Sequence, residues 1–376
     1  MIFPPIVDKI IDIVISAGAA QGFFLGMLLT ARKNRRKPAN KILASLLAVL
    51  SVSILHSILA SPAFHSPYVI REPFILIIGP LLTFYVYELI GFRKIVWKDS
   101  LHFLPFVILI FFVLPVWTST ASPYAEFLRL NGLIISKIIW TLIVFQFGYY
   151  WSNILSVLHN HRTAVESEFS NIEGKTLSWV KFFLHVFGMF LFVLVLTLVI
   201  AFHSDQYESI DTIVCFGLSC AIFALGHNGL FQDEIFSLSA AEAQQPEKSL
   251  RSPQNKLEMP PEPREDEQWK KLETHLEKSK PYLNESLTLT QLAEQLGITR
   301  NQLSALINNR HGNNFYSFIN MYRVEEVKRL ISDPKNSTFT ILSLAHDAGF
   351  PSKSSFQAIF KKFTGLTPTE YRKNLR

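Results

Sequence analysis

Cysteine is nearly absent from this 376-residue sequence, which contains only Cys215 and Cys220. The two lie five residues apart in one apolar run, where a helix would point them in different directions, so we expect no disulfide between them. Both thiols are predicted to be buried and inert. Residues 1–236 also lack a nucleophile–base pair, a phosphate-binding loop and a metal-ligand motif. The sequence therefore predicts no enzymatic activity, no cofactor and no metal site.

Net charge is absent from the chain before residue 267. Residues 267–376 carry sixteen Lys and Arg against ten Asp and Glu, an excess that equals the +6 of the whole chain. A basic C-terminal segment fits a polyanionic partner. The rest is strongly apolar: the chain has 32 Phe and a mean hydropathy of +0.24, which is unusual for a soluble globular protein.

Seven apolar runs are each near the length of a membrane-crossing helix. The first is followed by a basic cluster at residues 31–37 rather than preceded by one, which favours a retained helix over a cleaved signal peptide. A soluble core made of so many apolar runs would need a larger interior than this chain can build. The runs cover residues 10–30, 42–60, 74–90, 101–117, 133–150, 180–202 and 210–231. We therefore predict a seven-helix transmembrane bundle within residues 1–236.

The charges of the intervening loops indicate an orientation. Loops on the side of the first basic cluster contain Arg93, Lys94, Lys98, Arg162 and Lys175. Loops on the other side contain Arg71 and Arg129, and residues 203–209 contain no Lys or Arg. The positive-inside rule then places the N-terminus outside and the C-terminus in the cytoplasm. The sequence predicts a multi-pass protein of the cytoplasmic (inner) membrane.

Two histidines, His56 and His185, lie deepest in the predicted spans and are candidates for a ligand or proton site, with ordinary buried histidines as the alternative. The seventh run has no Lys for a retinal Schiff base. The outer loops are too short for a folded sensor domain, so a signal would reach the helices, their loops or a partner protein.

Residues 237–266 change character and contain five prolines among many Gln, Glu, Ser and Lys. Such a segment buries too little apolar surface to fold, and we predict a flexible linker. A protease site is an alternative, although nothing in the segment singles it out.

Two helix-turn-helix patterns follow in residues 267–376. In the first, Gly297 ends a short helix and residues 298–309 form a second one. In the second, Gly349 marks the turn and Ser352 is the predicted N-cap of a helix that buries Phe356, Ile359, Phe360 and Phe363. An 18-residue helix over residues 315–332 joins the two patterns. A helix-turn-helix with a polar, basic second helix has the shape that enters a DNA major groove.

The second pattern closely resembles the signature of AraC/XylS-type transcription regulators. The matching positions are Gly349, Phe350, Ser352, Phe356, Phe360, Lys361, Lys362, Gly365, Thr367, Pro368, Tyr371 and Arg372. The resemblance covers residues 269–372, including the Arg323 region of the joining helix, and no motif extends it to the membrane part. It implies an all-α protein with a double helix-turn-helix DNA-binding domain. Some bacterial regulators of this type have membrane-spanning N-terminal halves, and this chain looks like one of them.

The DNA-binding candidates are chosen by exposed position and chemistry. Asn301 and Gln357 can pair with adenine edges, and Lys353 can reach a guanine edge or a phosphate. Ser304 and Ser354 are small donors, while Ala305 and Ala358 stand where the family often has Arg, so a thymine methyl contact is the better expectation there. The phosphate candidates are Arg300, Ser352, Lys361, Lys362 and Arg372. For each lysine, a solvated surface charge is the alternative.

The sequence thus predicts a membrane-bound, sequence-specific transcription regulator whose transmembrane part senses a signal. Expected partners are double-stranded DNA, the lipid bilayer, RNA polymerase, a second copy of the chain and an unidentified signal ligand or membrane protein. One alternative is a membrane transporter or enzyme that carries a regulatory DNA-binding tail. Another is a DNA-binding domain that acts only after proteolytic release.

Overall fold

A computed structural model of the chain describes residues 5–31, 37–63, 73–118, 123–204, 208–231 and 265–375. The chain divides into two compact units, Met1–His159 with Leu177–Ala243 and Asn160–Thr176 with Gln244–Arg376. The described residues are helical and contain no named strand, as the predicted all-α fold requires. The predicted linker lies outside them up to residue 264, and the next helix begins at Glu265.

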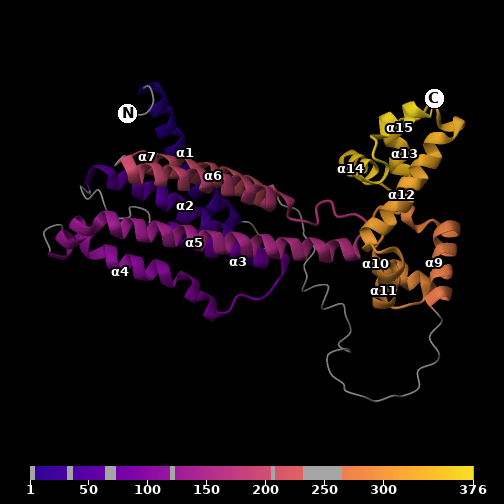
Figure 1. Cartoon of the computed structure of the whole chain (residues 1–376), viewed down its shortest axis with the longest axis horizontal. Coiled ribbons are helices and arrows are strands. Elements are labelled where there is room, and N and C mark those ends of the chain that lie inside the picture. The colour runs from indigo at the N-terminus through magenta and orange to yellow at the C-terminus, as the bar shows by residue number, and fades with distance from the viewer. Residues whose placement is uncertain are drawn as a thin grey trace, which may run out of the picture. The chain divides into compact units, whose positions relative to one another are not determined.

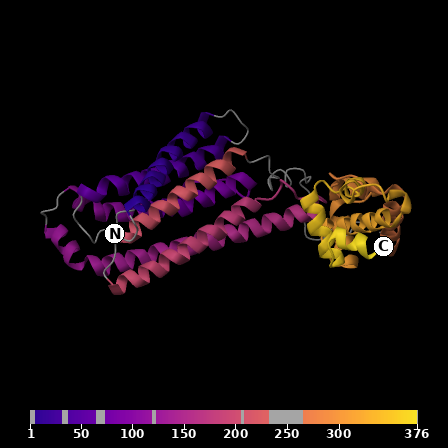
Figure 2. The same cartoon turned by 90° about the horizontal axis from the view of Figure 1, so that it is seen from above.

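The first unit is a bundle of long helices (Figures 1 and 2). Helix α1 packs against α2 and α7, α2 also packs against α3 and α7, and α6 packs against α7. The elements are α1 (Pro5–Ala31), α2 (Lys37–Ala63), α3 (Ile75–Ile90), the 3-10 helix η1 (Trp97–Phe103), α4 (Leu104–Thr118), α5 (Pro123–Glu168), α6 (Ser178–Ser204) and α7 (Glu208–Phe231).

Three helical stretches, and not seven, are long and apolar enough to cross a membrane among the described residues. They are Lys9–Ala31, Pro38–Ile58 and Lys137–Glu168. The apolar helices Ile75–Ile90 and Ile213–Gly229 are shorter. At about 1.5 Å per residue they reach roughly 25 Å, less than the ~30 Å hydrocarbon core. In α6, several side chains fall outside the described part of the chain.

Helix α5 differs most from its predicted bounds. Residues 133–150 were expected to form a span followed by a loop, whereas the helix runs over 46 residues from Pro123 to Glu168. No proline interrupts the chain after Pro123 until the helix has ended, and residues 151–168 continue it. The residues of α5 from Asn160 onward belong to the second unit.

Glycines let α1 approach its neighbours closely. Gly18, Gly22 and Gly26 recur every four residues and so share one face of the helix. A Cβ at Gly18 would lie 2.6 Å from the Cβ of Ser219 in α7, and one at Gly26 would lie 3.3 Å from the carbonyl oxygen of Ala44 in α2. Small residues at this spacing allow backbone-to-backbone packing of the kind found between membrane helices.

Replacing Gly18 with Leu should therefore destabilise the first unit. Overpacking of this kind costs about 1–3 kcal/mol, because the neighbouring helix must move. The purified chain should melt at a lower temperature than the wild type. Gly148→Leu is the matched control, since no atom lies within 4 Å of a Cβ at Gly148. Equal melting temperatures for the two variants would contradict the close packing.

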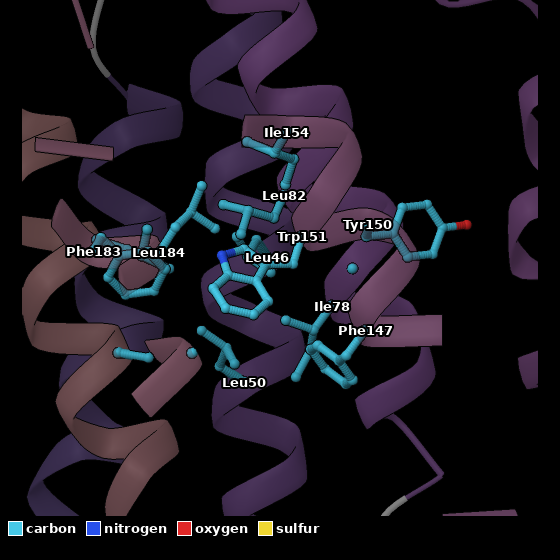
Figure 3. A pocket seen from close by; sticks show the side chains of 14 residues that line it. Leu46, Leu50, Ile78, Leu82, Phe147, Tyr150, Trp151, Ile154, Phe183 and Leu184 are labelled. Atoms are coloured by element: carbon cyan, nitrogen blue, oxygen red, sulfur yellow. The ribbon is translucent and has the colours of Figure 1, made fainter. Parts of the chain in front are cut away.

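A small apolar cavity of about 30 Å³ lies in the first unit (Figure 3). The Trp151 indole stands among the lining side chains, and its buried Nε1 has no hydrogen-bond partner. The hydroxyl of Tyr150 points away from them and lies 2.7 Å from Nδ1 of His102. The volume is about that of one water molecule, whereas small-molecule sites have about 300–1,000 Å³. This cavity is therefore too small for an organic ligand.

The predicted ligand histidines occupy different surroundings. His56 in α2 packs edge-on against Phe74, with ring centroids 5.8 Å apart. His185 in α6 is exposed, and its Nδ1 lies 2.6 Å from the carbonyl oxygen of Lys181, one turn earlier. Cys215 is buried as predicted, whereas Cys220 is exposed, and both are free thiols.

Besides the end of α5, the second unit contains nine helical elements among its described residues. They are α9 (Glu265–Ser279), η2 (Pro281–Leu283), α10 (Leu289–Leu296), α11 (Arg300–His311), α12 (Phe315–Ser332), η3 (Pro334–Asn336), α13 (Ile341–Asp347), α14 (Lys353–Thr364) and α15 (Pro368–Asn374). In Figure 1, α12 runs from the group of α9, α10 and α11 to the group of α13, α14 and α15.

Candidate nucleic-acid interface

The first helix-turn-helix consists of α10 and α11. Thr288 caps α10 by accepting a hydrogen bond from the Gln291 N–H, and the Gln291 side chain accepts one from the Thr288 N–H. Gly297 ends the helix with φ +70°, a conformation that favours glycine. Thr299 then caps α11 in the same reciprocal way with Gln302. These local signals place α11 at Arg300–His311, two residues later at each end than the predicted 298–309.

The second helix-turn-helix consists of α13 and α14. Gly349 makes the turn with φ +89°, and Ser352 caps α14 by accepting from the Ser355 N–H, as predicted. A Cβ at Gly349 would lie 2.6 Å from the carbonyl oxygen of Tyr282 in η2. The turn therefore packs directly against backbone that precedes the first helix-turn-helix.

Helix α12 belongs to two hydrophobic cores at once. Its first half supplies Phe315, Phe318 and Ile319 to a core shared with α9, α10 and α11. Its second half supplies Val324 and Val327 to a core shared with α13 and α14. One continuous helix of 18 residues, about 27 Å long, thus holds both helix-turn-helix pairs.

Arg323 is fully buried where these two cores meet. Its guanidinium donates to the carbonyl oxygens of Tyr282 (2.8 Å), Asn284 (2.8 Å) and Ser170 (2.9 Å) and to the hydroxyl of Ser170 (2.9 Å). Burial lowers the pKa of Arg323 to about 10, so it remains protonated at neutral pH. Nearby, Lys280 pairs with Glu326 at 3.0 Å, which ties η2 to α12 again.

The predicted base-reading residues lie on exposed faces of α11 and α14. On α11, Asn301 and Ala305 are exposed and Ser304 is half-buried, while the opposite face is buried through Leu303, Leu306 and Ile307. On α14 the exposed residues are Lys353, Ser354, Gln357, Ala358, Lys361 and Lys362. Each second helix thus turns one polar face outward, as a groove-reading helix would.

One core prediction for α14 is wrong. Phe356, Ile359 and Phe360 are buried, but Phe363 is 38% exposed. Phe363 lies in the last turn of the helix, and the Lys362 ammonium stands 6.0 Å from its ring centre. It therefore lies on the exposed surface beside Lys362 rather than in the core.

Three of the predicted phosphate-contacting residues already have partners within the second unit. Arg372 donates to the carbonyl oxygens of Ser337 (2.6 Å) and Phe339 (2.9 Å), so its guanidinium holds α15 to the chain before α13. Arg300 and Ser352 instead contact carboxylates of Glu168 and Glu173. Lys361 and Lys362 remain exposed.

Residues 160–176 are the part of this surface that the sequence prediction missed. They were expected to lie in the loop between two spans, yet they pack onto the second unit through Ser170 and three glutamates. The available signal was the acidic group Glu166, Glu168 and Glu173 in a loop on the predicted cytoplasmic side, where positive charge is the rule.

Comparison with known proteins agrees with this architecture. A helix-turn-helix domain family matches residues 292–374. Over 91 residues, 24% of this chain, the sequence is 35% identical to an uncharacterized HTH-type transcriptional regulator of Staphylococcus aureus (strain COL). Over 90 residues it is 31% identical to the melibiose operon regulatory protein of Escherichia coli (strain K12). The chain spans 12% and 29% of these relatives' lengths, and no solved structure matches it significantly.

Proposed function

We propose that this chain is a membrane-bound transcription regulator that binds specific DNA sequences through α11 and α14. The observation that carries the proposal is the pair of exposed polar helix faces held by one rigid helix, α12. Two such helices on one support can enter successive major-groove segments, which lie about 34 Å apart along one face of the duplex. The helix-turn-helix family match and the transcriptional-regulator names of the relatives support the same interpretation.

The first unit is proposed to anchor the regulator in the cytoplasmic membrane and to sense the signal. The three apolar stretches long enough to span a bilayer support the anchor. The remaining four of the seven predicted spans are also part of this proposal. So is the orientation, with the N-terminus outside and the second unit in the cytoplasm, which the positive-inside bias of the loops supports. RNA polymerase and a second copy of the chain are the proposed protein partners, and DNA is the nucleic-acid partner.

Replacing Lys353 and Gln357 together with Ala should lower specific DNA affinity by about 2–6 kcal/mol, because each good base contact is worth about 1–3 kcal/mol. A duplex would first be selected from a random-sequence pool by the purified full-length protein. Fluorescence anisotropy then compares its binding to the wild type and the variant.

Lys270→Ala is the charge-matched control. Lys270 is exposed on α9, outside both helix-turn-helix pairs, so its removal should leave affinity within about threefold of wild type after charge screening. If the double variant binds the selected duplex as tightly as Lys270→Ala does, α14 does not read DNA.

A further inference from the structure

The segment at residues 160–176 is docked on the second unit by its backbone. The Ser170 N–H and hydroxyl both donate to the carbonyl oxygen of Leu287, at 3.2 Å and 2.7 Å, and Phe169 forms an antiparallel bridge with Thr288. The Ser170 carbonyl oxygen accepts from Asn320 and Arg323 of α12. Ser170 itself is 1% exposed. The segment is therefore part of the folded second unit rather than a loose loop.

Its three glutamates sit at the N-terminal ends of helices. Glu168 accepts from the Arg300 Nε (2.6 Å) at the start of α11, and from the hydroxyl (2.7 Å) and N–H (3.3 Å) of Thr290 in the first turn of α10. Glu173 accepts from the Ser352 hydroxyl (2.6 Å) at the N-cap of α14. Glu166 accepts from the Asn314 amide (3.0 Å) at the N-cap of α12.

These are positions suited to phosphate. A helix N-terminus offers free N–H groups and a partial positive charge, and DNA phosphates are held there by Arg, Ser and backbone N–H donors. Arg300 and Ser352 are the donors that the sequence analysis assigned to phosphates. In the structure, carboxylate oxygens fill both places, one for each helix-turn-helix.

We propose that residues 160–176 form an autoinhibitory segment whose glutamates occupy the phosphate positions of both helix-turn-helix pairs and so exclude DNA. The inference rests on the proposed DNA-binding function. The Arg300 Nε–H and the Ser352 hydroxyl can each donate to only one anion at a time. The docked segment and a DNA duplex therefore compete for these two donors. Because the segment is the covalent continuation of α5, a rearrangement of that helix is the step that would withdraw it and permit DNA binding.

The first test neutralises the competing charges in the full-length protein. The variant Glu168→Gln/Glu173→Gln should bind the selected duplex about tenfold or more tightly than the wild type, within the usual range of coupling between two sites. Glu273→Gln/Glu277→Gln removes the same charge from exposed positions of α9 and is the control for simple electrostatics. Equal affinity of the wild type and the first variant, or an equal gain in both variants, would overturn the proposal.

A second test follows the segment itself. Adding the duplex to the wild-type chain should speed hydrogen exchange of the Ser170 amide, because bound DNA displaces the segment from Leu287. Unchanged exchange on a chain saturated with the duplex would mean that DNA and the segment bind together, which contradicts the proposal. If no duplex is bound by the wild type or by the glutamine variant, the proposed DNA-binding function fails instead.

Discussion

Replacing Arg323 with Ala should lower the unfolding free energy of the second unit by about 3–5 kcal/mol. The substitution removes a fully buried side chain and leaves a cavity between the two cores that α12 joins. It also removes the donor to the buried carbonyl oxygen of Tyr282 and both guanidinium contacts to Ser170. An acceptor left unpaired inside a protein costs about 1–3 kcal/mol, so both losses act in the same direction.

Hydrogen exchange of the α12 amides in the full-length chain measures this loss, since α12 supplies buried side chains to both cores. Arg323→Met separates the two causes, because it restores most of the buried volume without restoring the hydrogen bonds. Arg329→Ala is the control on the same helix: its side chain is 56% exposed, and Glu326 keeps its pair with Lys280 when Arg329 is removed. If the second unit is as stable in the Arg323→Ala variant as in the Arg329→Ala variant, the buried hydrogen-bond network contributes little to its stability.

Replacing Gly349 with Ala should cost the second unit about 3 kcal/mol, through two separate effects. The first is the left-handed backbone at φ +89°, where a residue with a Cβ loses about 1–2 kcal/mol. The second is a clash, because the added Cβ would lie 2.6 Å and 2.8 Å from the carbonyl oxygens of Tyr282 and Leu283. Neither oxygen belongs to a side chain that can rotate away, so η2 must move.

Gly365→Ala isolates the first effect. Gly365 also has a positive φ, +76°, but no atom lies within 4 Å of the Cβ position. Thermal unfolding of the second unit should therefore show a smaller loss of stability for Gly365→Ala than for Gly349→Ala. The expected loss for Gly365→Ala is about 1–2 kcal/mol. Equal losses for the two variants would mean that η2 yields to the new methyl group at no cost.

Both helix-turn-helix pairs were predictable because their signals are local. A cap such as Thr299 or Ser352, a glycine such as Gly297 or Gly349 and an apolar face repeating every three or four residues need only the neighbouring sequence. The exposed faces of α11 and α14 follow from the same periodicity. Phe363 was predicted wrongly because periodicity continues to the last turn of a helix, whereas the packing neighbours do not.

The first unit was predicted less well for a related reason. Apolar runs locate helices, but the ends of those helices depend on the flanking residues, and residues 151–168 continue α5 instead of ending it. The close packing at the α1 glycines likewise depends on the tertiary structure, which places Gly18 against Ser219 and Gly26 against Ala44 of other helices.

The sequence by itself determined the all-α class, the two helix-turn-helix pairs and the side chains that they expose, since each depends on hydrogen bonds and apolar spacing within a few residues. Only the tertiary structure decided that Arg323 is the buried link between two cores, that Arg372 holds the chain before α13, and that Glu168 and Glu173 meet Arg300 and Ser352. Those partners lie 33 to 179 residues apart along the chain. Contacts at such separations arise from the packing of whole elements, for which no local pattern exists.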